Sequence, residues 1–191
     1  MLNFAHESGI ILILLQMEVI FMNKTKKLVT SALLAAFACI ATLISVGPLP
    51  PTNGYIHLGD ALVIMCGFIL GPIYGGIAAA IGSAAADCIL GYVVYAPATF
   101  VIKFLVALTA GLLYRAKPCK TPGIIWISVL AELVMIVGYY IFEAFILTGG
   151  IGAVAALYAI PANAIQALSG VIIATIITKI FKSNAHIRKL L

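Results

Sequence analysis

Charged side chains are scarce in this 191-residue chain, because Asp, Glu, Lys and Arg together make up only 9% of it. An ordinary soluble domain is about 25% charged, since its surface must face water. Hydrophobic residues make up 64% of the sequence, and the mean hydropathy is +1.21. This composition excludes a soluble domain and a disordered chain, and it favours a protein embedded in a lipid bilayer. The 11 basic residues are too few for a nucleic-acid-binding surface, so we expect no nucleic acid partner.

The chain also lacks the short motifs that support hydrolysis, redox chemistry or metal binding. It contains no GxxxxGK[ST] nucleotide-binding loop, no HExxH and no GxSxG. Its four cysteines are widely spaced without a CxxC pair, so neither a zinc site nor a thiol redox site has support. We therefore expect no enzyme, no catalytic residue, no metal site and no cofactor.

Six apolar segments predict an all-α, polytopic membrane protein with six transmembrane helices in a single domain, residues 22–191. The segments cover about residues 28–46, 56–70, 73–92, 99–114, 123–147, and a last helix that begins near Ile160. Helices are expected because a backbone in lipid must satisfy its own hydrogen bonds.

Residues 1–21 do not fit this pattern. Their apolar run at 9–21 is too short to span a bilayer and is interrupted by Glu18. It lacks the basic start and cleavage site of a signal peptide, whereas Met22 precedes a lysine-rich start typical of a first span. We interpret residues 1–21 as an N-terminal extension that is not native, and an interfacial helix is the alternative.

The basic residues set the orientation of the six spans. Apart from Lys103, they lie before the first span, after the fourth and at the end of the sixth: Lys24, Lys26, Lys27, Arg115, Lys117, Lys120, Lys179, Lys182, Arg188 and Lys189. With six spans, all of these positions fall on one side of the membrane. The positive-inside rule makes that side cytoplasmic, with both termini inside.

Polar side chains within and beside the spans gather in the outer half of the membrane. Charges at membrane depth cost about 2.5–3.5 kcal/mol each, so they face a cavity or one another. We therefore predict an outward-facing binding pocket formed by Tyr55, His57, Asp60, Asp87, Lys103, Glu132, Tyr139, Glu143, Asn163 and Gln166. In the alternative interpretation, Lys103 pairs with Asp87 or Glu143 only to hold helices together.

The external loop at residues 47–57 is expected to cover this pocket. It contains three prolines and an Asn53-Gly54 turn signal. The second span is only about 22 Å long, so it cannot reach the outer interface by itself. The loop must therefore dip into the membrane and bring Tyr55 and His57 near Asp60. A plain short connection is the alternative.

Small residues on the first helix predict a close helix contact. Ser31 and Ala35 are four residues apart, as are Ala32 and Ala36. Such faces let another helix approach closely, either within the chain or in a partner protein.

Four motifs together resemble the substrate-specific (S) components of energy-coupling factor (ECF) vitamin transporters. They are NGYIHLGD at residues 53–60, LGPIYG at 70–75, SAAAD at 83–87 and YAPATFVIK at 95–103. The similarity covers about residues 28–182 and is greatest to the hydroxymethylpyrimidine, pyridoxine and riboflavin types. The resemblance implies six helices with an outward pocket under the first external loop.

The resemblance also implies partners. S components work with a transmembrane coupling protein and two cytoplasmic ATPases, and they dock through an Ala-x-x-x-Ala face on helix one that Ala32 and Ala36 match. The proposed family mechanism is toppling of the whole S component in the bilayer. We expect a multi-pass protein of a bacterial plasma membrane that captures a small vitamin, with hydroxymethylpyrimidine or pyridoxine favoured and riboflavin or pantothenate as further candidates.

Within the predicted pocket, each group has an expected role. Asp60, Asp87 and Lys103 would hydrogen-bond the ligand, and Tyr55 and Tyr139 would contact its ring. Glu143, Asn163 and Gln166 would complete the polar rim, with Glu132 at the floor. Three other functions stay open at this point: a stand-alone ion-coupled carrier, a membrane enzyme, and a structural subunit without a ligand.

Overall fold

The structure is a computed structural model that describes residues 24–49, 54–116, 120–147 and 152–183. The described elements are α2 (Lys24–Leu43), β1 (Ser45–Leu49), β2 (Gly54–His57), α3 (Asp60–Leu70), α4 (Pro72–Leu90), α5 (Ala96–Ala116), α6 (Thr121–Ile141), the π-helix η1 (Phe142–Ile146), α7 (Ala153–Leu157) and α8 (Ile160–Ser183). The predicted extension at residues 1–21 lies outside the described residues.

Six apolar helices form the bundle, as the sequence predicted. Five are long and apolar enough to cross a membrane: α2, α4, α5, α6 together with η1, and α7 together with α8. The sixth, α3, has only 11 residues and is apolar all round. A helix of this kind is stable only inside a bundle, and most residues of α3 are buried.

The predicted ends of the first two helices are wrong. The first was expected to reach Val46 and the second to begin at Ile56, but residues 45–49 and 54–57 form an antiparallel hairpin. In it, Ser45 pairs with His57 and Val46 with Ile56. The apolar character of these residues resembles a helix end in sequence, whereas Pro48 disfavours a continuing helix and the β-branched Val46 and Ile56 suit a strand.

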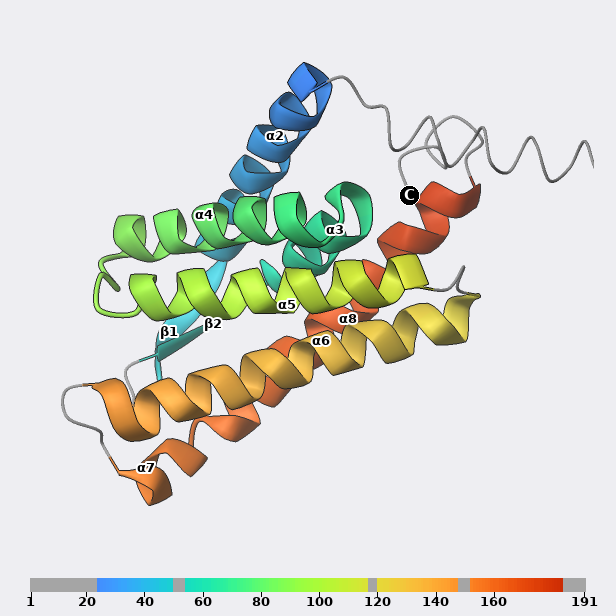
Figure 1. Cartoon of the computed structure of the whole chain (residues 1–191). Helices are drawn as coiled ribbons and strands as arrows, with labels where there is room; N and C mark the ends of the chain where they lie inside the picture. Colours follow the sequence, from blue (N-terminus) through green and yellow to red (C-terminus); the bar gives the residue numbers. More distant parts are fainter. Residues whose placement is uncertain (1–23, 50–53, 117–119, 148–151, 184–191) are drawn as a thin grey trace, which may run out of the picture.

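Helix α3 lies inside the bundle, whereas the hairpin packs at its edge, where Val46 on β1 is 72% exposed. In Figure 1, α4, α5 and α6 lie side by side, with α8 behind them and α2 leaning away at one edge. Helix α5 packs against α3, α4 and α6, while α8 packs against α3 and α6. Strand β2 contacts α8 and α2, which tucks the hairpin into the bundle. The hairpin packs against the bundle through these contacts, and its function as a cover over the pocket stays a prediction.

Apart from Lys103, the described basic residues gather at one end of the bundle. The Lys27 ammonium lies 4.0 Å from the ring centre of Tyr74 at the start of α4, and Lys182 lies 5.3 Å from that of Tyr114 at the end of α5. The Arg115 guanidinium donates to the carbonyl of Leu70 at 3.2 Å, at the end of α3. This end is the cytoplasmic one by the positive-inside rule. Lys117, Arg188 and Lys189 lie outside the described residues.

Helix α2 is the most peripheral of the six helices. Only 17% of its best apolar window is buried, against 39–50% for the other four long helices. Its inner contact is with α4 at Gly82, where an added Cβ would lie 2.3 Å from the Ala35 carbonyl oxygen. A side chain at Gly82 would therefore push α2 away from α4.

We predict that Gly82→Val destabilises the bundle by about 1–3 kcal/mol, because overpacking forces the two helix backbones apart. The matched control is Ala85→Val, which adds volume to the exposed face of the same helix. Unfolding in a denaturing-detergent titration, followed by the fluorescence of the single tryptophan, measures the difference. Equal stability of the two variants would contradict the close α2–α4 contact.

Candidate functional site

A buried ion pair forms the centre of the polar cluster. Lys103 on α5 is completely buried and pairs with Asp60, the first residue of α3. The Gln166 amide on α8 donates to the other Asp60 oxygen at 2.6 Å. The start of a helix also favours a negative charge. The Asp60 carboxylate thus joins three helices.

This pairing corrects one alternative from the sequence. Lys103 was expected to pair with Asp87 or Glu143 if its role were only to hold helices together, but its partner is Asp60. The short α3 and the inward hairpin bring the two to the same level.

His57 connects the hairpin to this ion pair. Its backbone N–H donates to the Gln166 side-chain oxygen at 3.0 Å, and its Nδ1 accepts from the Gly59 N–H at 3.0 Å. The side chain is buried, and this burial lowers the pKa of the imidazole, so the ring is neutral at pH 7. Gln166 therefore bridges the hairpin and Asp60, which holds the hairpin over the cluster.

A second set of polar groups lies beside Lys103. The hydroxyls of Thr99 and Tyr139 are hydrogen-bonded at 3.0 Å, and the Lys103 ammonium is 5.4 Å from the ring centre of Tyr139. The Tyr55 hydroxyl donates to Asp87 on α4. These contacts bring α4, α5, α6 and the hairpin together around one region.

Aromatic rings cover the cluster where α4 ends and α5 begins. Tyr55 stacks on Tyr92, with ring centres 4.5 Å apart, and Tyr92 meets Tyr95 edge-on. The Tyr95 hydroxyl donates to Glu143 at 3.5 Å. Sequence reasoning missed Tyr92 and Tyr95 as site residues. Their position at a turn between two spans was the available signal, since tyrosines concentrate at membrane interfaces.

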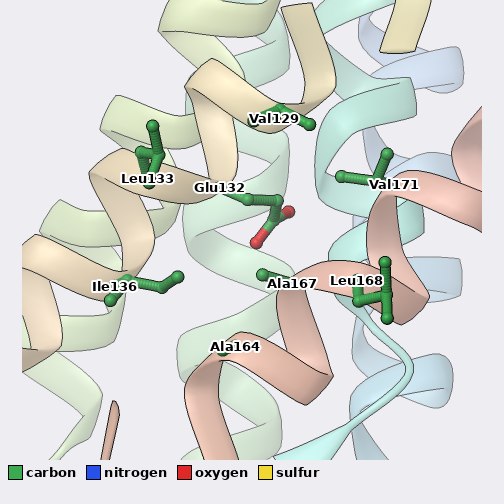
Figure 2. Close-up of a pocket in the computed structure, with 8 residues that line it drawn as sticks. All are labelled: Val129, Glu132, Leu133, Ile136, Ala164, Ala167, Leu168 and Val171. Atoms are coloured by element: carbon green, nitrogen blue, oxygen red, sulfur yellow. The ribbon is translucent and has the colours of Figure 1, made fainter. Parts of the chain in front are cut away.

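Glu132 lies at the bottom of a groove between α6 and α8 (Figure 2). It is 2% exposed, and neither carboxyl oxygen has a hydrogen-bond partner among the residues that the structure describes. An added Cβ at Gly170 would lie 3.0 Å from the Cβ of Asp60 and 3.3 Å from Oε1 of Glu132. Gly170 therefore lets α8 pack closely against both Asp60 and Glu132.

Asn163 is a predicted pocket residue that does not join the polar cluster. Its side chain is half-buried, and among the described residues it makes no hydrogen bond to the cluster. The other predicted pocket residues contact one another or lie next to the cluster. The structure thus brings most of the predicted set together in the outer half of the bundle.

The small residues of α2 divide into two faces. Ala35 lies against α4 at Gly82, and the Ser31 hydroxyl bonds to the Lys27 carbonyl of its own helix. Ala32 and Ala36 are exposed and face away from the bundle. Only this second pair is available to a partner helix.

We predict that Lys103→Met lowers the free energy of unfolding by about 3–5 kcal/mol, because it leaves the Asp60 carboxylate buried without its cation. The double variant Lys103→Met/Asp60→Asn removes both charges and should recover much of this loss. Denaturing-detergent titration measures all three proteins. A single variant as stable as the original chain would show that the ion pair does not stabilise the bundle.

Comparisons with known proteins agree with this architecture. A family model described as an ECF-type riboflavin transporter S component matches residues 22–183. A solved structure, described as the S component of a bacterial ECF transporter, has a TM-score of 0.69 and covers 84% of this chain and 98% of its own. Its sequence is 23% identical, so this likeness concerns the fold.

A curated protein of Pyrococcus woesei, described only as an uncharacterized protein in a gap 3' region, is also similar. It is 36% identical over 135 residues, which is 70% of this chain and 86% of that protein. The family model, in contrast, extends over all the described residues. The chain therefore belongs to the ECF-type riboflavin transporter S component family, and it is a multi-pass membrane protein that binds a vitamin for transport and is not an enzyme.

Proposed function

We propose that the vitamin captured by this chain is riboflavin. The observation that carries the proposal is the match of residues 22–183 to a family model described by that substrate. Hydroxymethylpyrimidine and pyridoxine, which the sequence favoured, become the competitors to be tested. Riboflavin combines a flat three-ring system with a flexible chain of hydroxyl groups, so its site must offer both ring contacts and hydrogen bonds.

The geometry supports a ligand with these two parts. Hydrogen-bonding groups converge at Asp60, Lys103 and Gln166, where ligand hydroxyls could exchange with the existing contacts. Ring contacts are available from the stacked Tyr55 and Tyr92 and from the aliphatic groove between α6 and α8. The polar groups are hydrogen-bonded to one another in the described structure, so a ligand must replace contacts and not merely add them.

Entry of the ligand would require movement of the hairpin. Two side-chain contacts hold it over the cluster: Tyr55 to Asp87 and the backbone of His57 to Gln166. We propose that both contacts break when the ligand enters from outside and that the hairpin then closes over it. This is the lid role that the sequence suggested for residues 47–57.

Transport requires energy from other proteins. The sequence has no nucleotide-binding loop, so we propose that a transmembrane coupling protein and two cytoplasmic ATPases drive uptake across the plasma membrane. The exposed pair Ala32 and Ala36 on α2 is the proposed docking face, because small residues permit close approach of a partner helix.

We predict that the purified chain in lipid nanodiscs binds riboflavin and quenches its fluorescence, and that hydroxymethylpyrimidine, pyridoxine and pantothenate do not compete. Tyr55→Ala should weaken riboflavin binding about threefold to tenfold, since an aromatic stacking contact is worth about 0.5–1.5 kcal/mol. Tyr158→Ala, which removes an exposed ring, is the control. Tight binding of one of the other three vitamins, without riboflavin binding, would overturn the proposed substrate.

We predict that the double variant Ala32→Leu/Ala36→Leu loses co-purification with the coupling protein and riboflavin uptake in cells, while riboflavin binding stays unchanged. Bulky side chains on this face would hold a partner helix away. Ala85→Leu, on the exposed face of α4, is the matched control. Undiminished uptake by the double variant would contradict this docking face, and uptake in cells without any ATPase partner would favour a stand-alone carrier.

A further inference from the structure

The groove between α6 and α8 ends at the buried carboxyl group of Glu132. Glu132 is 2% exposed, and both of its oxygens lack a partner among the described residues. Figure 2 shows its carboxyl projecting from α6 toward α8, into the space between the two helices. A buried polar group without a hydrogen bond is costly, so this position calls for a complementary group.

The walls of the groove are apolar. Leu133 and Ile136 line it from α6, and Ala164, Ala167 and Leu168 line it from α8 (Figure 2). Small alanines on the α8 side leave a space of about 200 Å³ between the helices. Walls of this kind suit the two faces of a flat ring, while a single polar group at the bottom suits one edge of that ring.

The nearby charges indicate which form of Glu132 the ligand meets. Lys103 is already paired with Asp60. The Cβ of Asp60 and Oε1 of Glu132 lie 3.0 and 3.3 Å from the position that a Cβ on Gly170 would take, so the two acidic side chains are near neighbours. An ionised Glu132 would place a second negative charge beside Asp60, in an apolar groove and with no cation hydrogen-bonded to it among the described residues. A buried, unpaired negative charge of this kind is unfavourable in free energy, so the neutral carboxyl is favoured in the groove.

A neutral carboxyl group presents one donor beside one acceptor. Its O–H can donate to a carbonyl while its C=O accepts from an adjacent N–H. The complementary partner is a cyclic amide edge, in which an N–H lies next to a C=O. Two parallel hydrogen bonds would then satisfy both oxygens of Glu132.

We infer that Glu132, in its neutral form, recognises the cyclic amide edge of a flat heterocyclic substrate that inserts edge-on between α6 and α8. The inference rests on the proposed function, because riboflavin carries such an edge at the N3–H of its ring system. It assigns a substrate class to the groove: planar rings with a donor beside an acceptor. Lipid tails could fill the apolar walls, but they have no group for the carboxyl.

The test compares riboflavin with 3-methylriboflavin, in which a methyl group replaces the N3 hydrogen. In nanodiscs, the original chain should bind the methylated compound at least about tenfold more weakly, the loss expected for a buried hydrogen bond. Glu132→Leu should bind riboflavin about tenfold more weakly and should no longer distinguish the two compounds. Glu132→Gln keeps a neutral donor beside an acceptor, so it should bind both compounds much as the original chain does.

Ser128→Ala is the matched control, because it removes another buried, unpartnered oxygen one turn away on the same helix. It should leave riboflavin binding and the preference for the unmethylated compound unchanged. If Glu132→Leu does not fold, the two compounds on the original chain and on Glu132→Gln still decide the result.

Each other outcome has a definite meaning. Equal binding of the two compounds by the original chain, or riboflavin binding by folded Glu132→Leu at full strength, overturns the role of Glu132 and leaves the proposed function intact. A loss in Glu132→Gln as large as that in Glu132→Leu overturns recognition by the neutral form. No riboflavin binding by the original chain overturns the proposed substrate, and this inference with it.

Discussion

An ion pair inside a lipid-embedded bundle is the constraint around which this structure is arranged. Lys103 and Asp60 are both completely buried, and neither could stay charged at this depth without the other. Through Gln166, the same carboxylate is joined to α8 and to the hairpin. Three helices and the external hairpin therefore meet at one point, and any ligand that binds there changes the contacts of all of them together.

The shortness of α3 places this point in the outer half of the membrane. With 11 residues, α3 is about 16 Å long, so it crosses only part of the bilayer. The hairpin fills the remaining depth and brings Tyr55 and His57 down to the level of Asp60 and Lys103. This arrangement supports the proposed capture site beneath the hairpin, because the polar groups gather at the end of α3 that the hairpin contacts.

One face of α2 packs against the bundle, and the other is the proposed docking face. Ala35 packs against Gly82 and fixes the helix to the bundle, whereas Ala32 and Ala36 remain exposed. A membrane subunit without its own nucleotide-binding loop needs a surface of this kind. The proposed docking face lies on the least buried of the long helices, and this helix contributes none of the residues of the proposed ligand site around Asp60, Lys103 and Gln166.

The sequence by itself determined six apolar helices, because lipid forces helical backbones. It also predicted their orientation and the polar residues of the site, because lipid penalises every charge outside a shared polar region. Only the tertiary structure decided which side chains contact one another. Lys103 pairs with Asp60, the loop is a hairpin, and Glu132 has no partner within the described residues. The spacing of residues along one helix predicts which side chains share a face of that helix. The rotation and depth of neighbouring helices depend instead on packing contacts such as those at Gly82, and no single segment specifies these contacts.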